Sequence, residues 1–203
     1  MTKFIFLIIF SGFIFIVPSY SQQSDVINNN NNFFYVGPAD LFFNTLQIVY
    51  EKELKNTNSI AILGGFKLSE KAGYINRIGG NGELQYRINL LYKKQGLSKL
   101  AKNFSTFAYF APYLQYRYEE ITDKIYISEL YSVNQISTVD SYFGGLGFGC
   151  RLTGIENRFC LNVFAGGGLK YSDLYGDKKY SDFFQVGYTG IAPKFGFQMG
   201  IAF

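Results

Sequence analysis

The chain has 203 residues and a net charge of +4, which leaves room for one domain or two very small ones. Apolar residues make up 48% of the chain and charged residues only 17%, so many apolar side chains must face something other than water. The absence of histidine excludes Ser-His-Asp and Cys-His catalysis and removes the commonest transition-metal ligand, and no run of Lys and Arg indicates nucleic-acid binding. We therefore expect no cofactor, no metal and no nucleic-acid partner.

Residues 1–21 have the pattern of a secretory signal peptide. A lysine precedes an apolar run over residues 4–17, and small residues precede a cleavage point after Ser21. The run is short for a membrane helix, and an uncleaved anchor is the alternative. The asparagine-rich stretch 22–32 is expected to be a flexible lead-in, which leaves 33–203 as the folded domain.

Beyond the lead-in, bulky apolar residues alternate with polar or small ones. A period of two separates the two sets onto opposite faces of a strand, whereas a helix would scatter them around its axis. The sequence therefore predicts strands at residues 45–51, 59–68, 83–92, 112–119, 144–152, 159–164 and 193–203.

The two faces of these strands distinguish a membrane barrel from a soluble sandwich. The apolar face is continuous and has tyrosines near the segment ends, as a lipid-facing band with aromatic girdles requires. The other face carries acids and bases, which a sandwich core would not hold but a narrow barrel interior accommodates when they pair. The expected interior network consists of Glu51, Glu83, Arg87, Arg117, Glu119, Arg151 and Lys194.

Seven strands are one short of the even number that such barrels use. We expect the eighth at Phe33–Phe43, although Pro38 interrupts that segment. A second candidate is Asp182–Thr189.

The predicted connections alternate in length. Residues 52–58 and 153–158 are short connections, whereas 69–81, 120–140 and 172–190 are long ones of the kind that membrane barrels place outside the cell. Aromatic side chains among charges suit recognition of an extracellular partner, and a tyrosine-rich membrane rim is the alternative. The candidate contacts in these loops are Tyr126, Tyr175, Lys178, Lys179 and Tyr180.

The last strand resembles the C-terminal signal of Gram-negative outer-membrane β-barrels, which the barrel-assembly machinery recognises. The matching positions are Phe195, Phe197, Met199, Ile201 and the terminal aromatic Phe203. Residues 33–203 as a whole resemble the small eight-stranded barrel family that includes OmpA's transmembrane domain and OmpX. A first segment of the form P-x-x-L-F-x-x-T-L-x-I-x-Y-E, here running from Pro38 to Glu51, is similar to that of largely uncharacterised barrel proteins.

The resemblance implies a location in the outer membrane, in contact with its lipid, and implies little about activity. We expect an all-β, antiparallel, up-and-down transmembrane barrel of eight strands, without enzymatic activity, that is structural or mediates surface interaction. The alternatives are a soluble secreted barrel with an apolar ligand, a small outer-membrane channel, and an outer-membrane enzyme. The enzyme is disfavoured because the familiar barrel enzymes use histidine.

A glycine-rich segment and a pair of cysteines suggest a phosphate-binding loop and a disulfide, but the strand pattern favours neither. GGLGFG at 144–149 lacks the following helix of a phosphate loop, and its glycines are expected to leave room for bulky residues opposite. Alternation places Cys150 outward and Cys160 inward, so no disulfide is expected between them. The short turn predicts that Arg151 pairs with Cys160.

Overall fold

The computed structural model describes residues 32–41, 44–54, 58–72, 75–93, 104–128, 131–154, 158–176, 182 and 185–203. The expected signal peptide and most of the lead-in lie outside this set. The described residues form eight strands and one short helix. In chain order these are β1 (Asn32–Val36), α2 (Pro38–Leu41), β2 (Thr45–Glu53), β3 (Ser59–Ala72), β4 (Ile75–Lys93), β5 (Phe104–Ser128), β6 (Tyr131–Gly154), β7 (Phe159–Tyr175) and β8 (Gly190–Ala202).

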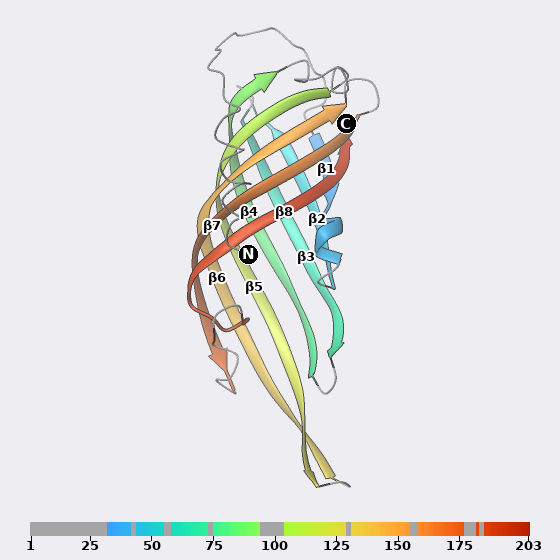
Figure 1. The fold of residues 1–203 in the computed structure, drawn as a ribbon, viewed down its shortest axis with the longest axis vertical. Helices are drawn as coiled ribbons and strands as arrows, with labels where there is room; N and C mark the ends of the chain where they lie inside the picture. Colours follow the sequence, from blue (N-terminus) through green and yellow to red (C-terminus); the bar gives the residue numbers. More distant parts are fainter. Residues whose placement is uncertain are drawn as a thin grey trace, which may run out of the picture.

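Each strand pairs antiparallel with the next along the chain, and β1 pairs with β8, so the sheet closes into a ring (Figure 1). The ring has the form of a barrel, although its strands are not arranged evenly around a single axis. The predicted all-β, up-and-down fold of eight strands is therefore confirmed. We call the end of the barrel that holds Asn32 and Phe203 the terminal end, and the end that holds the β5–β6 turn the hairpin end.

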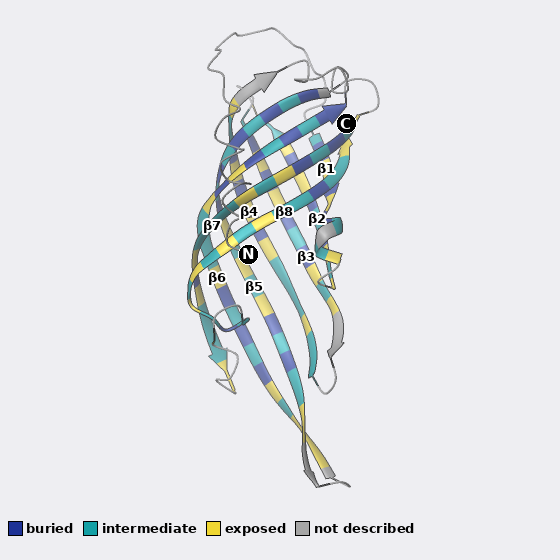
Figure 2. Ribbon diagram, viewed as in Figure 1, coloured by how far each residue is buried: buried dark blue, intermediate teal, exposed yellow. Residues whose placement is uncertain are grey.

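Side chains alternate between the interior and the outer surface along each strand, which Figure 2 shows as bands of buried and exposed residues. On β2, Glu51 is 1% exposed, whereas its neighbour Tyr50 is 40% exposed. The outer face is largely apolar, and the interior holds most of the buried charges. This is the reverse of the usual arrangement in a water-soluble domain.

The first strand is shorter than predicted. It ends at Val36 and not at Phe43, because Pro38 begins helix α2, where its missing amide and fixed φ are tolerated. Asn44 then turns the chain with a φ of 52°, a left-handed conformation that asparagine accepts more readily than most residues. The β1–β2 connection consequently turns back part-way along the barrel.

Two predicted loops are mostly strand. Residues 69–81 and 120–140 continue the β3–β4 and β5–β6 pairings, and the β5–β6 hairpin projects well beyond its neighbours (Figure 1). The second candidate for the eighth strand was wrong, because the described residues of 182–189 contain no strand.

The β6–β7 register also differs from the prediction. Arg151 pairs with Asn162, and Thr153 pairs with Cys160, which is a shift of two residues from the predicted register. A shift of two leaves every side chain on its own face. Both cysteines are accordingly unbonded, with Cys160 buried inside and Cys150 on the outer face.

Candidate functional site

The interior near the terminal end is organised around one carboxylate. Glu51 on β2 accepts hydrogen bonds from Arg87 on β4 at 2.7 Å and from Arg151 on β6 at 2.8 Å. The Tyr35 hydroxyl donates to it at 3.1 Å, and the Ser59 hydroxyl donates as well. Both oxygens of this buried anion are therefore satisfied from several strands, as a buried charge requires.

The two arginines are held from their other sides. Arg151 also donates to Glu53 at 3.1 Å and lies over the Phe33 ring at 4.0 Å, while Arg87 lies over the Tyr109 ring at 4.8 Å. Two guanidinium groups and two carboxylates balance in charge, and the aromatic faces favour the cations. We call the set Tyr35, Glu51, Glu53, Ser59, Arg87 and Arg151 the plug, since its members meet across the interior from five strands, β1, β2, β3, β4 and β6.

A chain of neutral hydrogen bonds lies beside the plug. Tyr109 donates to Asn162 at 2.9 Å, Asn162 donates to Gln198 at 2.8 Å, and Gln198 donates to Gln47 at 3.2 Å. Asn162 and Gln198 are both 0% exposed. The chain joins β5, β7, β8 and β2 and adds a second closed layer to the interior.

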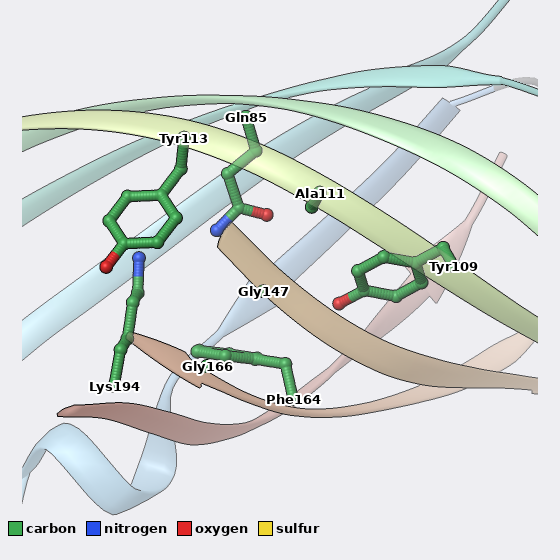
Figure 3. Close-up of a pocket in the computed structure, with 8 residues that line it drawn as sticks. All are labelled: Gln85, Tyr109, Ala111, Tyr113, Gly147, Phe164, Gly166 and Lys194. Atoms are coloured by element: carbon green, nitrogen blue, oxygen red, sulfur yellow. The ribbon is translucent and has the colours of Figure 1, made fainter. Parts of the chain in front are cut away.

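Next to this layer is a void of about 10 Å³, room for about one water molecule (Figure 3). At the edge of this void, the Lys194 ammonium lies over the Tyr113 ring, 4.0 Å from its centre, and forms an ion pair with Glu83. Gly149 allows the Tyr109 ring to lie here, because a Cβ at that position would overlap the ring. The glycine-rich segment thus makes room for a bulky residue, as expected.

A larger cavity of about 440 Å³ lies in the half of the interior towards the hairpin end. Its walls carry ion pairs: Lys194 with Glu83, Lys67 with Glu119 at 3.4 Å, and Arg117 with Glu119 at 3.7 Å. The Glu83 side chain is 1% exposed. This volume falls in the range of small-molecule sites, so the cavity is the part of the interior with room for a ligand.

An apolar cluster, which we call the apolar cap, lies beyond the cavity towards the hairpin end. Ile121 and Val139 are buried there, and Ile75, Leu174 and Val186 pack against them. Val186 belongs to the connection between β7 and β8, and its carbonyl accepts a hydrogen bond from the buried Lys170 ammonium. The connection is thereby fixed inside the mouth of the barrel.

The structure places all seven predicted network residues on the interior side of their strands. Five are buried, whereas the Lys194 and Arg117 side chains are 18% and 38% exposed at the cavity. Glu51, Arg87 and Arg151 belong to the plug, whereas the other four line the cavity. Gln85 joins the two groups, since it accepts a hydrogen bond from Arg87 at 2.9 Å and donates one to Glu83 at 2.6 Å. The prediction omitted Tyr35, Ser59, Tyr109, Asn162 and Gln198, which lie on the inward faces that alternation defines.

The other predicted residues lie at the surface or outside the described set. The last strand points Phe195 and Ile201 outward, 72% and 54% exposed, with Phe197, Met199 and Phe203 on the same face. Tyr175 is 62% exposed at the end of β7. Tyr126 is part of β5 and pairs with Ser132, but its side chain is outside the description, as are Lys178, Lys179 and Tyr180.

Comparisons with protein-family models, curated proteins and solved structures gave no significant match. The resemblance to small outer-membrane barrels is therefore supported at the level of the fold alone. The helical part of the described chain contains no segment long and apolar enough to cross a membrane. Among all the residues that the structure describes, no group of three or more acidic, cysteine or histidine side chains is placed to hold a metal ion.

Proposed function

We propose that the protein is an outer-membrane β-barrel, closed along its axis, that acts by contact at the cell surface. The observation that carries the proposal is the combination of an apolar outer face with a charged interior. Leu114, Leu169 and Phe195 are 68%, 69% and 72% exposed, whereas Glu51 and Arg87 are 1% exposed. Lipid around the barrel removes the cost of exposing such a surface to water.

The polarity of the outer face changes where a membrane boundary is expected. Outward residues of β6 from Leu152 to Tyr142 are apolar or glycine, and Asp140 follows. On β5 the same change falls between Tyr118 and Glu120. The apolar stretch has about the 9–11 residues of a membrane strand, and tyrosines end it as in an aromatic girdle.

The interior argues against the alternative functions. A soluble carrier of an apolar ligand needs an apolar pocket, whereas the plug and the cavity walls are charged. A channel needs a continuous polar path, which the plug interrupts at one level and the apolar cap at another. We therefore propose binding rather than transport or catalysis.

The element best placed for contact is the β5–β6 hairpin. It extends beyond the apolar band and its outward face becomes polar at Glu120, Thr122 and Lys124. We propose that it meets an extracellular partner. The outward row of aromatic and apolar residues on β8 is the surface that we propose the barrel-assembly machinery recognises.

Epitope insertion tests both location and orientation. A tag placed between Ser128 and Tyr131, at the hairpin turn, is expected to bind antibody on intact cells. The matched control is the same tag in the β6–β7 turn, between Gly154 and Arg158, which is expected to react only after the outer membrane is permeabilised. Equal labelling of both tags in intact cells, or purification of the wild-type protein in buffer without detergent, would contradict the proposal.

A further inference from the structure

We propose that the 440 Å³ cavity binds the uncharged, hydroxylated head group of a glycolipid, which enters sideways from the membrane through a gap in the strand pairing. This inference rests on the membrane location proposed above.

The gap lies between β8 and β3. β1 pairs with β8 only from Met199 to Ala202, so the described residues place no strand beside Gly190–Gln198 on that side. On the other side, β2 pairs with β3 only as far as Lys67. Helix α2 contacts β2 and β8 beside this gap, and the Leu68 amide of β3 donates to the Asn44 carbonyl at 2.7 Å. Pro193 on the β8 edge has no amide to leave unpaired.

The cavity communicates with this gap. Its lining includes Asp40 of α2 on one side and Ala192, Pro193 and Phe195 of β8 on the other. Along the barrel axis it lies between the plug and the apolar cap. The side opening is the route of entry in this proposal, because the Phe195 side chain, which is 72% exposed on the outer face, is also part of the cavity lining.

The charges of the lining select an uncharged ligand. Four basic side chains and three acidic ones face the cavity, and each sign repels a ligand of the same sign. Ion pairs between Lys194 and Glu83, and between Lys67 and Glu119, already join most of these charges. A charged head group would compete with these pairs for their partners, whereas a neutral one fits beside them.

The cavity lining contains buried hydrogen-bond acceptors that a ligand with donor groups could satisfy. The Asn81 Oδ1 and Glu83 Oε2 atoms are buried and accept no hydrogen bond from the described part of the chain. Both residues line the cavity, together with the aromatic rings of Tyr113, Phe143 and Phe164. Hydroxyl groups supply donors to such acceptors, and a sugar ring also has C–H faces that pack on aromatic rings.

The outer surface at the gap suits an acyl chain. Ile191 and Phe195 on the β8 side are each 72% exposed, and Phe66 and Leu68 on β3 are 64% and 53% exposed. A ligand with a hydroxylated head inside and a hydrocarbon chain outside matches this change of polarity. A free sugar would use only half of the site.

The experiment places the wild-type protein in phosphatidylcholine nanodiscs that contain a minor share of digalactosyl diacylglycerol, and native mass spectrometry identifies lipid retained after release. We expect one galactolipid per barrel, enriched about tenfold over phosphatidylcholine. Ala192→Phe fills the entrance and should abolish retention. Ala108→Phe is the matched control, since it makes the same substitution on the outward face of β5, away from the gap, and it should leave retention unchanged.

A second variant tests recognition without blocking the entrance. Asn81→Leu removes one acceptor at similar volume and should lower galactolipid enrichment about tenfold. Equal retention of both lipids by the wild type, or an unaltered enrichment in both Ala192→Phe and Asn81→Leu, overturns the inference. Tight binding of free digalactose overturns the sideways entry. A barrel that inserts into nanodiscs but retains no galactolipid refutes this inference alone, whereas a protein that does not insert refutes the proposed function as well.

Discussion

Glu51 and Arg151 are separated by 100 residues in the sequence, and their side chains meet at 2.8 Å in the centre of the barrel. Arg87 reaches the other oxygen of the same carboxylate at 2.7 Å. Because the three residues belong to β2, β4 and β6, their contacts form only when the sheet has curved round on itself in the correct register. The plug contacts therefore form only in a correctly closed barrel, and the same side chains fill the interior at this level.

Breaking one side of the plug should be costly. Arg87→Leu leaves Glu51 with one guanidinium partner fewer in a dry interior, and we expect a loss of about 3–5 kcal/mol in the free energy of unfolding. Urea titration of the protein in lipid vesicles measures it. Lys52→Leu, on the exposed face of the same strand, is the control and should change stability by no more than about 0.5 kcal/mol. Similar effects of the two substitutions would show that the plug contributes little.

Because the plug and the apolar cap lie at two levels of the interior, we expect that the protein does not conduct ions. In planar bilayers we expect no sustained current from the wild type. Val186→Asp puts a charge into the apolar cap and should loosen it, yet it should also give no current, because the plug is intact. Discrete current steps from the wild-type protein would mean that a continuous water path passes the plug.

Gly149 should tolerate a side chain poorly. A Cβ there overlaps the Tyr109 ring, so Gly149→Val must displace the ring and weaken its hydrogen bond to Asn162. We expect a destabilisation of about 1–3 kcal/mol, measured by urea unfolding. Gly82→Val is the control, since a Cβ at Gly82 has no neighbour within 4 Å, and its effect should be much smaller. Equal tolerance at both positions would place the Tyr109 ring elsewhere.

The two thiols should differ in reactivity. Cys160 is buried, with its thiol 3.7 Å from the Thr153 hydroxyl, whereas Cys150 lies on the outer face. A membrane-permeant maleimide should label Cys150 in the folded protein and Cys160 only after unfolding. Mass spectrometry of the unreduced, alkylated protein gives the count. A mass lower by two hydrogens with no alkylation would reveal a disulfide and a misassigned face.

The faces of the strands could be predicted because alternation depends only on the pleat of the backbone. Glu51 and Tyr50 are neighbours with opposite environments, and the sequence pattern alone separates them. The ends of the strands could not be predicted in the same way. Beyond Tyr118 the outward residues become polar, so the contrast between faces fades, although the backbone pairing with β6 continues to Ser128.

The alternation of residues in the sequence also could not predict that the interior is divided into a plug and a cavity. Alternation shows that Glu83 and Glu51 face inward, but not that Glu51 lies at the centre of the plug while Glu83 lines the cavity. That depends on the register between strands and on where β1 ends. Both are set by turns, where Pro38 and Asn44 determine the course of the chain.

The short first strand has a mechanical consequence. β1 and β8 share four residue pairs, from Phe33 with Ala202 to Val36 with Met199, whereas the β5–β6 ladder runs from Phe104 to Ser128. Backbone hydrogen bonds in a short ladder have few neighbours to hold them when one opens. The seam between the first and last strands is thus the weakest line of the ring, where the cylinder should part first under heat or tension, and where deuterium should enter earliest.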